Sequence, residues 1–262
     1  MPGSGIGVYL DGSLPSALLG KGTRVLELGL ASLAGLRVDE FRAVLAHEYG
    51  HFGHGDTRWS SFSAALGNSL LEALREMPGP GTAGGQGTGT QALFALNPAY
   101  WILRLFHRLY TRVTNKFSRL GEVRADAVAV QTYGSDAFAS GLTRLYVSDR
   151  VFTVAAQPRY IEALRWRLPT LRQFSTLMDR SHHGVSETVQ QNFAEEARAV
   201  VTRGSEHDSH PPIGVRLQYA RLWARSGDED ARSVTCLFDN WDTLDQQAAR
   251  LYNQHLTAVY CP

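Results

Sequence analysis

Residues 38–57 read VDEFRAVLAHEYGHFGHGDT, and the fold is built around this stretch. Apolar side chains recur through it at helical spacing, for example at Phe41, Val44 and Leu45. Asp39 and Glu40 stand at its start, where the dipole of a helix favours negative charge. The pattern predicts a helix from about residue 38 to residue 52, which the glycines at 53 and 55 would end.

Within this predicted helix, residues 47–51 read HEYGH, which is an HExxH motif. Because residues i and i+4 share a helix face, His47 and His51 can bind the same zinc ion. Glu48 lies one position further round and can reach a water molecule on that metal. A catalytic zinc also needs a third protein ligand and keeps its fourth position for water.

The classes of HExxH enzyme differ in the residue that supplies the third zinc ligand. The metzincin motif needs glycine at position 54 and histidine at position 57, but this chain has His54 and Thr57. A deformylase-like site takes a cysteine upstream of HExxH, and that class is excluded because Cys236 and Cys261 both lie far downstream. The remaining option is a glutamate on a later helix, which is the gluzincin arrangement.

Two downstream glutamates, Glu122 and Glu72, are candidates for this ligand, and each has a second carboxylate four residues later. Asp126 shares a helix face with Glu122, where it can accept a hydrogen bond from a ligand histidine and fix the orientation of the ring. The corresponding partner of Glu72 is Glu76, next to Met77 at a fraying helix end. Spacing alone leaves both glutamates as candidates for the third ligand. Glu122 is favoured, because a fraying helix end is a poor place for the carboxylate that would support Glu72.

The rest of the chain indicates helices after a short β-rich start. Residues 7–10 and 23–27 predict two strands, and helical patterns follow at about 59–76, 99–113, 116–133, 135–147, 213–225 and 243–257, with further helices between 150 and 203. Six glycines and two prolines in residues 77–91 indicate a flexible loop, long enough to cover a cleft and hold an enzyme latent. We therefore expect one α+β domain over residues 1–262, predominantly α-helical with a small N-terminal β-sheet.

The composition excludes several classes of protein. Hydrophobic residues make up 44% of the chain and charged residues 19%, which is typical of a globular protein. Because 26 Lys and Arg nearly balance 25 Asp and Glu, no electrostatic argument favours nucleic acid as a partner. Charges interrupt the apolar runs and no signal peptide opens the sequence, so the chain is expected to be soluble as written.

A third feature is His210, followed by two prolines and then by Arg216 on a predicted helix. A proline pair stiffens the start of a helix and can aim a neighbouring side chain at a fixed place. Acidic residues and a second histidine just before it are equally typical of a polar surface loop. The residues alone leave both interpretations open.

Taken together, these segments resemble the bacterial branch of the CaaX prenyl protease and HtpX-like membrane zinc endopeptidases, which are gluzincins. The matching stretches are residues 38–57 quoted above, NPAYWILRLFHRLYTRVTNKFSRLGEVRADAVAV at 97–130 and DSHPPIGVRLQ at 208–218. The resemblance implies a zincin-like fold in which His47, His51 and Glu122 bind one catalytic Zn²⁺. It also implies that Glu48 is the catalytic glutamate and that Asp126 supports a ligand histidine.

The same resemblance implies roles for residues outside these two helices. His210 matches the family's histidine before the proline pair, which would face the substrate carbonyl, and Arg216 matches the arginine of the same motif. Either His210 or Arg216 would serve as the second donor to the oxyanion of the substrate. Val8, Tyr9 and Leu10 lie in the strand that would form the edge of the substrate cleft.

The implied activity is hydrolysis of peptide bonds in peptides or unfolded proteins, by a zinc-activated water with Glu48 as general base. The alternative is a zinc-stabilised scaffold or latent domain that binds partners without turnover. Members of the family usually carry transmembrane helices. We therefore expect membrane association of the full-length protein, at the cell membrane with a cytoplasm-facing catalytic domain, through segments that this chain does not encode.

Overall fold

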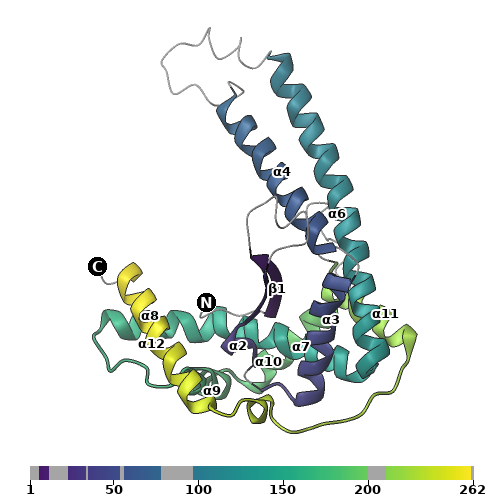
Figure 1. Cartoon of the computed structure of the whole chain (residues 1–262). Coiled ribbons are helices and arrows are strands. Elements are labelled where there is room, and N and C mark those ends of the chain that lie inside the picture. The colour runs from purple at the N-terminus through teal and green to yellow at the C-terminus, as the bar shows by residue number, and fades with distance from the viewer. Residues whose placement is uncertain are drawn as a thin grey trace.

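The computed structural model describes residues 6–11, 23–33, 35–53, 56–77, 97–199 and 211–260, and most of them are helical (Figure 1). Strands β1 (Ile6–Asp11) and β2 (Thr23–Leu28) come first. The helices are α2 (Leu30–Leu33), α3 (Val38–Gly53), α4 (Asp56–Glu76), α6 (Pro98–Tyr133), α7 (Ser135–Val151), α8 (Gln157–Arg165), α9 (Phe174–Gly184), α10 (Glu187–Arg198), α11 (Ile213–Trp223) and α12 (Trp241–Tyr260). A π-helical turn, η1 (Phe152–Ala156), joins α7 to α8, and a 3₁₀ turn, η2 (Val234–Leu237), precedes α12.

The two strands form an antiparallel pair, in which Val8 stands opposite Leu26 and Tyr9 opposite Val25. Both strands predicted from the sequence are present, slightly longer than expected. Within the described residues this pair is the whole sheet, and β1 lies against α3. The expectation of a mostly helical chain with a small N-terminal sheet is confirmed.

The main departure from the sequence prediction is α6. Two helices with a break near residue 114 were expected, but α6 runs unbroken from Pro98 to Tyr133. The hydroxyl of Thr114 donates to the carbonyl of Tyr110 at 2.9 Å, so this polar side chain bonds within the helix. Asn97 caps the start of α6 by accepting from the backbone N–H of Ala99 at 3.1 Å. Residues 98 to 133 therefore form a single element.

Helices α4 and α6 lie side by side and extend together away from the other helices (Figure 1). The hydroxyl of Tyr110 joins them by donating to the carbonyl of Ser63 at 2.8 Å. Apart from Met77, the loop predicted at 77–91 lies outside the described residues. None of the helices in the described ranges has both the length and the apolar character needed to cross a bilayer.

Helix α3 is fixed against α7 by a buried carboxylate. Glu40 is fully buried and accepts hydrogen bonds from the hydroxyl of Ser140 at 2.5 Å and from the guanidinium of Arg144 at 2.8 Å. Its second oxygen accepts from the backbone N–H of Arg37 at 2.9 Å. A satisfied buried network of this kind specifies one packing arrangement, so it orients the helix that carries HEYGH.

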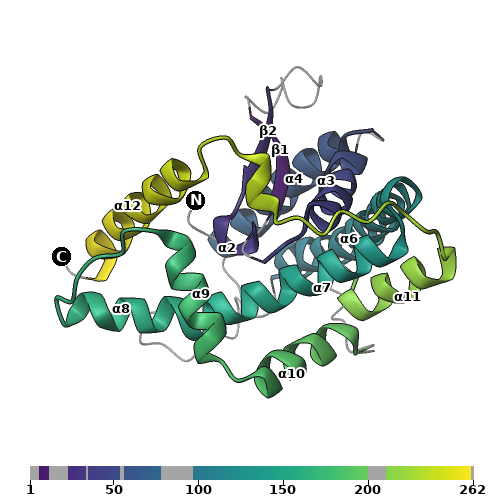
Figure 2. The ribbon, with the colours of Figure 1, turned by 90° about the horizontal axis from the view of Figure 1, so that it is seen from below.

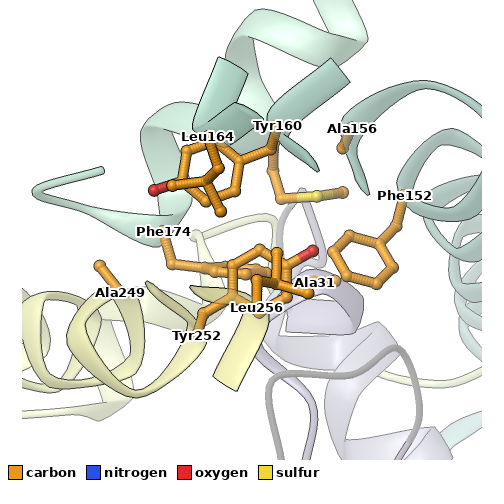
Figure 3. Close-up of a cluster of buried hydrophobic side chains, with 10 residues drawn as sticks. Ala31, Phe152, Ala156, Tyr160, Leu164, Phe174, Ala249, Tyr252 and Leu256 are labelled. Atoms are coloured by element: carbon orange, nitrogen blue, oxygen red, sulfur yellow. The ribbon is translucent and has the colours of Figure 1, made fainter. Parts of the chain in front are cut away.

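A separate hydrophobic cluster holds the C-terminal helix in place (Figure 3). Tyr252 of α12 stacks on Tyr160 of α8, with 5.8 Å between ring centroids, and meets the ring of Phe174 edge-on at 5.3 Å. The hydroxyl of Tyr160 donates to Asn253. Figure 2 shows α8 and α12 at the opposite end of the molecule from α11. This cluster stabilises the fold at a distance from the helices that carry the sequence motifs.

Candidate metal centre

Helices α3 and α6 bring three potential metal ligands together. The Nε2 atoms of His47 and His51 lie 3.3 Å apart. Glu122 Oε2 lies 3.5 Å from His47 Nε2, and Glu122 Oε1 lies 3.5 Å from His51 Nε2. His47 and Glu122 are buried and His51 is partly buried. The three side chains therefore point donor atoms at a common volume.

These separations are those of a tetrahedral zinc site. Ligand atoms held about 2.0–2.1 Å from a tetrahedral zinc are about 3.3–3.4 Å from one another. The 3.3 Å between the two imidazole nitrogens matches that value, and each histidine has one oxygen of Glu122 at 3.5 Å, Oε2 for His47 and Oε1 for His51. Two imidazole nitrogens and one carboxylate are also a donor set that zinc uses in catalytic sites, where the fourth position stays open. The residues thus fit a zinc ion in both geometry and chemistry.

Asp126 orients His47 from behind. His47 Nδ1 lies 2.9 Å from Asp126 Oδ1, which puts the imidazole proton on Nδ1 and leaves the Nε2 lone pair facing His51 and Glu122. Burial alone would raise the pKa of Asp126, but hydrogen bonds from His47 and Arg216, with the charge of Arg216, hold it below its ordinary value. Asp126 therefore remains an ionised acceptor despite being fully buried.

Arg216 of α11 connects the two carboxylates of α6. Its Nε donates to Asp126 Oδ2 at 2.9 Å and its Nη2 to Asp126 Oδ1 at 2.6 Å, while Nη1 lies 3.5 Å from Glu122 Oε2. Burial would lower the pKa of Arg216, but the hydrogen bonds and charge of Asp126, with the charge of Glu122, leave it above its ordinary value. The guanidinium is therefore engaged with Asp126 and Glu122, whereas the sequence analysis named Arg216, beside His210, as one of two candidate donors to the substrate oxyanion.

The same guanidinium also packs on His47. Arg216 Nη2 lies 3.2 Å from both ring nitrogens of His47. Because these two distances are equal, Nη2 lies over the face of the ring, out of line with the lone pair of either nitrogen. Phe138 of α7 lies beside both groups, with 6.2 Å between its ring centroid and that of His47 and 5.9 Å to the guanidinium carbon. The imidazole is thus held by a hydrogen bond at its edge and by packing at its faces.

An apolar pocket of about 280 Å³ opens beside Glu48. Leu142 and Leu145 of α7 line this pocket, and so does Ile6, the first residue of β1. The full lining is Ile6, Ser32, Val44, His47, Glu48, Phe138, Leu142, Leu145, Asp149 and Arg216. A mainly aliphatic and aromatic pocket next to the proposed metal ligands can accept an apolar side chain.

The other residues singled out in the sequence have different positions. Glu72, the rival to Glu122, is exposed on α4 and lies outside the ligand group. His210 lies outside the described residues. Val8, Tyr9 and Leu10 lie in β1, the strand whose first residue lines the pocket.

Sequence reasoning missed Gly50, which sets how closely α3 and α6 approach. A Cβ atom on Gly50 would lie 3.0 Å from the Cα of Ala125, tighter than ordinary packing. A signal was present, because a glycine inside a helix costs about 1 kcal/mol relative to alanine, and a glycine at such a position often allows a close contact. Phe138 was also missed, and nothing in its local sequence separates it from other apolar helix residues.

Replacing Gly50 with alanine is expected to lower zinc affinity about 10–100-fold, the range seen when the support of metal ligands is disturbed. The new methyl group would push on the α6 backbone at Ala125, between Glu122 and Asp126. Competition with a chromogenic chelator measures the affinity. Gly67→Ala is the matched control, because its methyl group would meet Tyr110 at an ordinary 3.5 Å. Equal zinc affinity for Gly50→Ala and the wild type would contradict this role for the helix crossing.

Residues 18–224 match the model of peptidase family M48. This range covers more than half of the chain and includes the HEYGH helix, Glu122, Asp126 and Arg216. Searches of curated proteins and of solved structures gave no significant match. The chain therefore belongs to peptidase family M48, a family of zinc-dependent metallopeptidases.

Proposed function

We propose that this chain is a zinc-dependent endopeptidase whose metal is held by His47, His51 and Glu122. One observation carries the proposal, namely the 3.3–3.5 Å separations among the three donor groups, which are those expected around a tetrahedral zinc. When bound, zinc supplies a Lewis acid that polarises the scissile carbonyl and lowers the pKa of a water molecule toward about 7.

Glu48 is the proposed general base. It follows His47 directly on α3 and lines the apolar pocket, which supports placing it beside the substrate. It would take the proton of the attacking water and deliver it to the nitrogen of the leaving amine, which is the usual cycle of a carboxylate base in peptide hydrolysis.

Asp126 and Arg216 are proposed to position the metal ligands and not to contact the substrate. Asp126 keeps the proton of His47 on Nδ1, and Arg216 holds Asp126 through both carboxylate oxygens. Arg216 also offsets the negative charge of Glu122 and Asp126, which would otherwise repel each other inside the protein. The proposed donor to the substrate oxyanion is then His210, on the sequence resemblance alone.

The proposed substrate is an extended peptide or unfolded protein with an apolar residue next to the scissile bond. Ile6 of β1 lines the pocket beside Glu48, which supports placing the substrate chain along β1, at Val8, Tyr9 and Leu10. The SRxxEVxAD pattern at 118–126 and the SHPPxxxR pattern at 209–216 favour the CaaX and HtpX-like branch of the family, with the catalytic domain facing the cytoplasm.

Glu122→Gln is expected to bind zinc at least tenfold more weakly, because an amide oxygen is a poorer zinc ligand than a carboxylate. Glu72→Gln, the same change at the exposed glutamate of α4, should bind zinc as the wild type does. Metal content after dialysis against a weak chelator measures both. Loss of zinc from the Glu72 variant, with retention by the Glu122 variant, would reverse the assignment of the third ligand.

Glu48→Gln is expected to keep stoichiometric zinc and to lose peptide hydrolysis about 10²–10⁴-fold, which is the usual contribution of a general base. The measurement is chelator-sensitive digestion of unfolded casein by the purified, zinc-loaded chain. Undiminished digestion by this variant would remove Glu48 from the role. If the zinc-loaded wild type digests nothing, the scaffold or latent alternative is favoured.

Leu142→Trp is expected to fill the pocket and change the substrate preference. The kcat/KM for peptides with leucine or phenylalanine next to the scissile bond should fall at least tenfold, while peptides with alanine there are cut as before. Leu222→Trp serves as control, because Leu222 is 77% exposed on α11. An unchanged preference in the Leu142 variant, with zinc retained, would show that the pocket does not select the substrate.

A further inference from the structure

The apolar pocket beside Glu48 contains an acidic group that the proposed reaction does not use. The residues of α7 that line this pocket are Phe138, Leu142, Leu145 and Asp149. Their spacing of four, three and four residues puts these side chains on one face of the helix. A carboxylate that ends an otherwise apolar row is not expected from packing alone.

Asp149 lies at the end of this row that is further from the candidate metal ligands. The ring centroids of Phe138 and His47 are 6.2 Å apart, so the row begins beside those ligands. Asp149 follows Leu142 by about two turns of α7, and helix side chains lean toward the N-terminus, which here is the direction of Leu145. A substrate side chain must therefore be long to reach the carboxylate of Asp149 from the scissile bond.

The carboxylate of Asp149 has no partner among the described residues. Its side chain makes no hydrogen bond or ion pair with them, and the hydroxyl of Thr153 donates to its main-chain carbonyl at 2.8 Å. The next residue, Arg150, is engaged with α10, where its Nε lies 3.8 Å from Glu196 Oε2 and its guanidinium 5.3 Å from the ring centre of Phe193. The neighbouring cation is thus used elsewhere.

The basic side chains of the pocket are also used elsewhere. Arg216 donates to both carboxylate oxygens of Asp126, and His47 Nδ1 lies 2.9 Å from the same side chain. Neither of these two lining residues is left to pair with Asp149. The complement of an apolar row that ends in a carboxylate is a side chain with an aliphatic stem and a cationic end.

We propose that Asp149 makes this pocket selective for lysine or arginine next to the scissile bond. The aliphatic part of either side chain would pack on Leu142 and Leu145, and its charged end would reach Asp149. A leucine of the substrate would fill the apolar part alone. This proposal rests on the peptidase function proposed above and narrows its substrate class, because a positive end is added to the apolar stem.

The test compares peptides that differ only in one of the two residues flanking the scissile bond. On one side of that bond, the zinc-loaded wild type should cut arginine and lysine peptides with a kcat/KM at least tenfold above that for methionine, a neutral side chain of similar length. Asp149→Asn should lower this ratio at least tenfold, because it removes the charge and keeps the shape. Asp179→Asn makes the same change at an exposed acid of α9 outside this pocket, and should keep the wild-type ratio. Circular dichroism and zinc content report whether each variant is folded.

Peptide binding separates this proposal from the peptidase function. Zinc-loaded Glu48→Gln is expected to bind peptides without cutting them, so fluorescence anisotropy can measure its affinity for each one. The arginine peptide should bind at least tenfold more tightly than the methionine peptide, and Glu48→Gln/Asp149→Asn should lose this difference. If the wild type cuts nothing but the difference in affinity is present, the peptidase function fails while the selectivity of the pocket is supported.

Two results would overturn the proposal. One is equal affinity of the folded chain for arginine and methionine peptides, together with equal kcat/KM wherever peptides are cut; hydrolysis without preference would leave the peptidase function standing. The other is a preference for arginine that persists in Asp149→Asn, because another group would then select the cation.

Discussion

The close crossing of α3 and α6 is the constraint on which the rest of the site depends. A Cβ atom on Gly50 would lie 3.0 Å from the Cα of Ala125, so a side chain there would push the backbone of α6 outward. Ala125 lies between Glu122 and Asp126 in the sequence of α6. A wider crossing would separate the imidazole nitrogens from Glu122, and their 3.3–3.5 Å spacing leaves little tolerance. The three candidate ligands are therefore positioned by backbone packing more than by side-chain choice.

Around this crossing, buried charges are balanced through contacts between distant helices. Glu40 joins α3 to α7 through Ser140 and Arg144, and Asp126 joins α6 to α11 through Arg216. In the pair of Asp126 and Arg216 both side chains are buried, and removing one partner of such a pair typically costs about 3–5 kcal/mol, because the other charge is left uncompensated. These networks consequently restrict the helices to the one arrangement in which the donor atoms converge.

The continuity of α6 gives one helix two different surroundings. Its C-terminal part is buried and carries Glu122 and Asp126, while its N-terminal part exposes apolar and basic side chains beside α4. The part of α6 that lies beside α4 is thus linked to Glu122 and Asp126 by an uninterrupted helix. This helix fixes the direction in which the arm of α4 and α6 leaves the candidate metal centre.

The sequence by itself determined the helix of HEYGH, the pairing of His47 with His51, and the strand and helix content, because these depend on local spacing and propensity. Local spacing left Glu122 and Glu72 open as the third ligand, while the helix end and the family resemblance favoured Glu122. The tertiary structure supports Glu122, because it groups this carboxylate with the two histidines and leaves Glu72 exposed, and such grouping is a property of packing. The contacts of Gly50 with Ala125 and of Arg216 with Asp126 also come from the tertiary structure, because contacts between helices far apart in the chain leave no local signature.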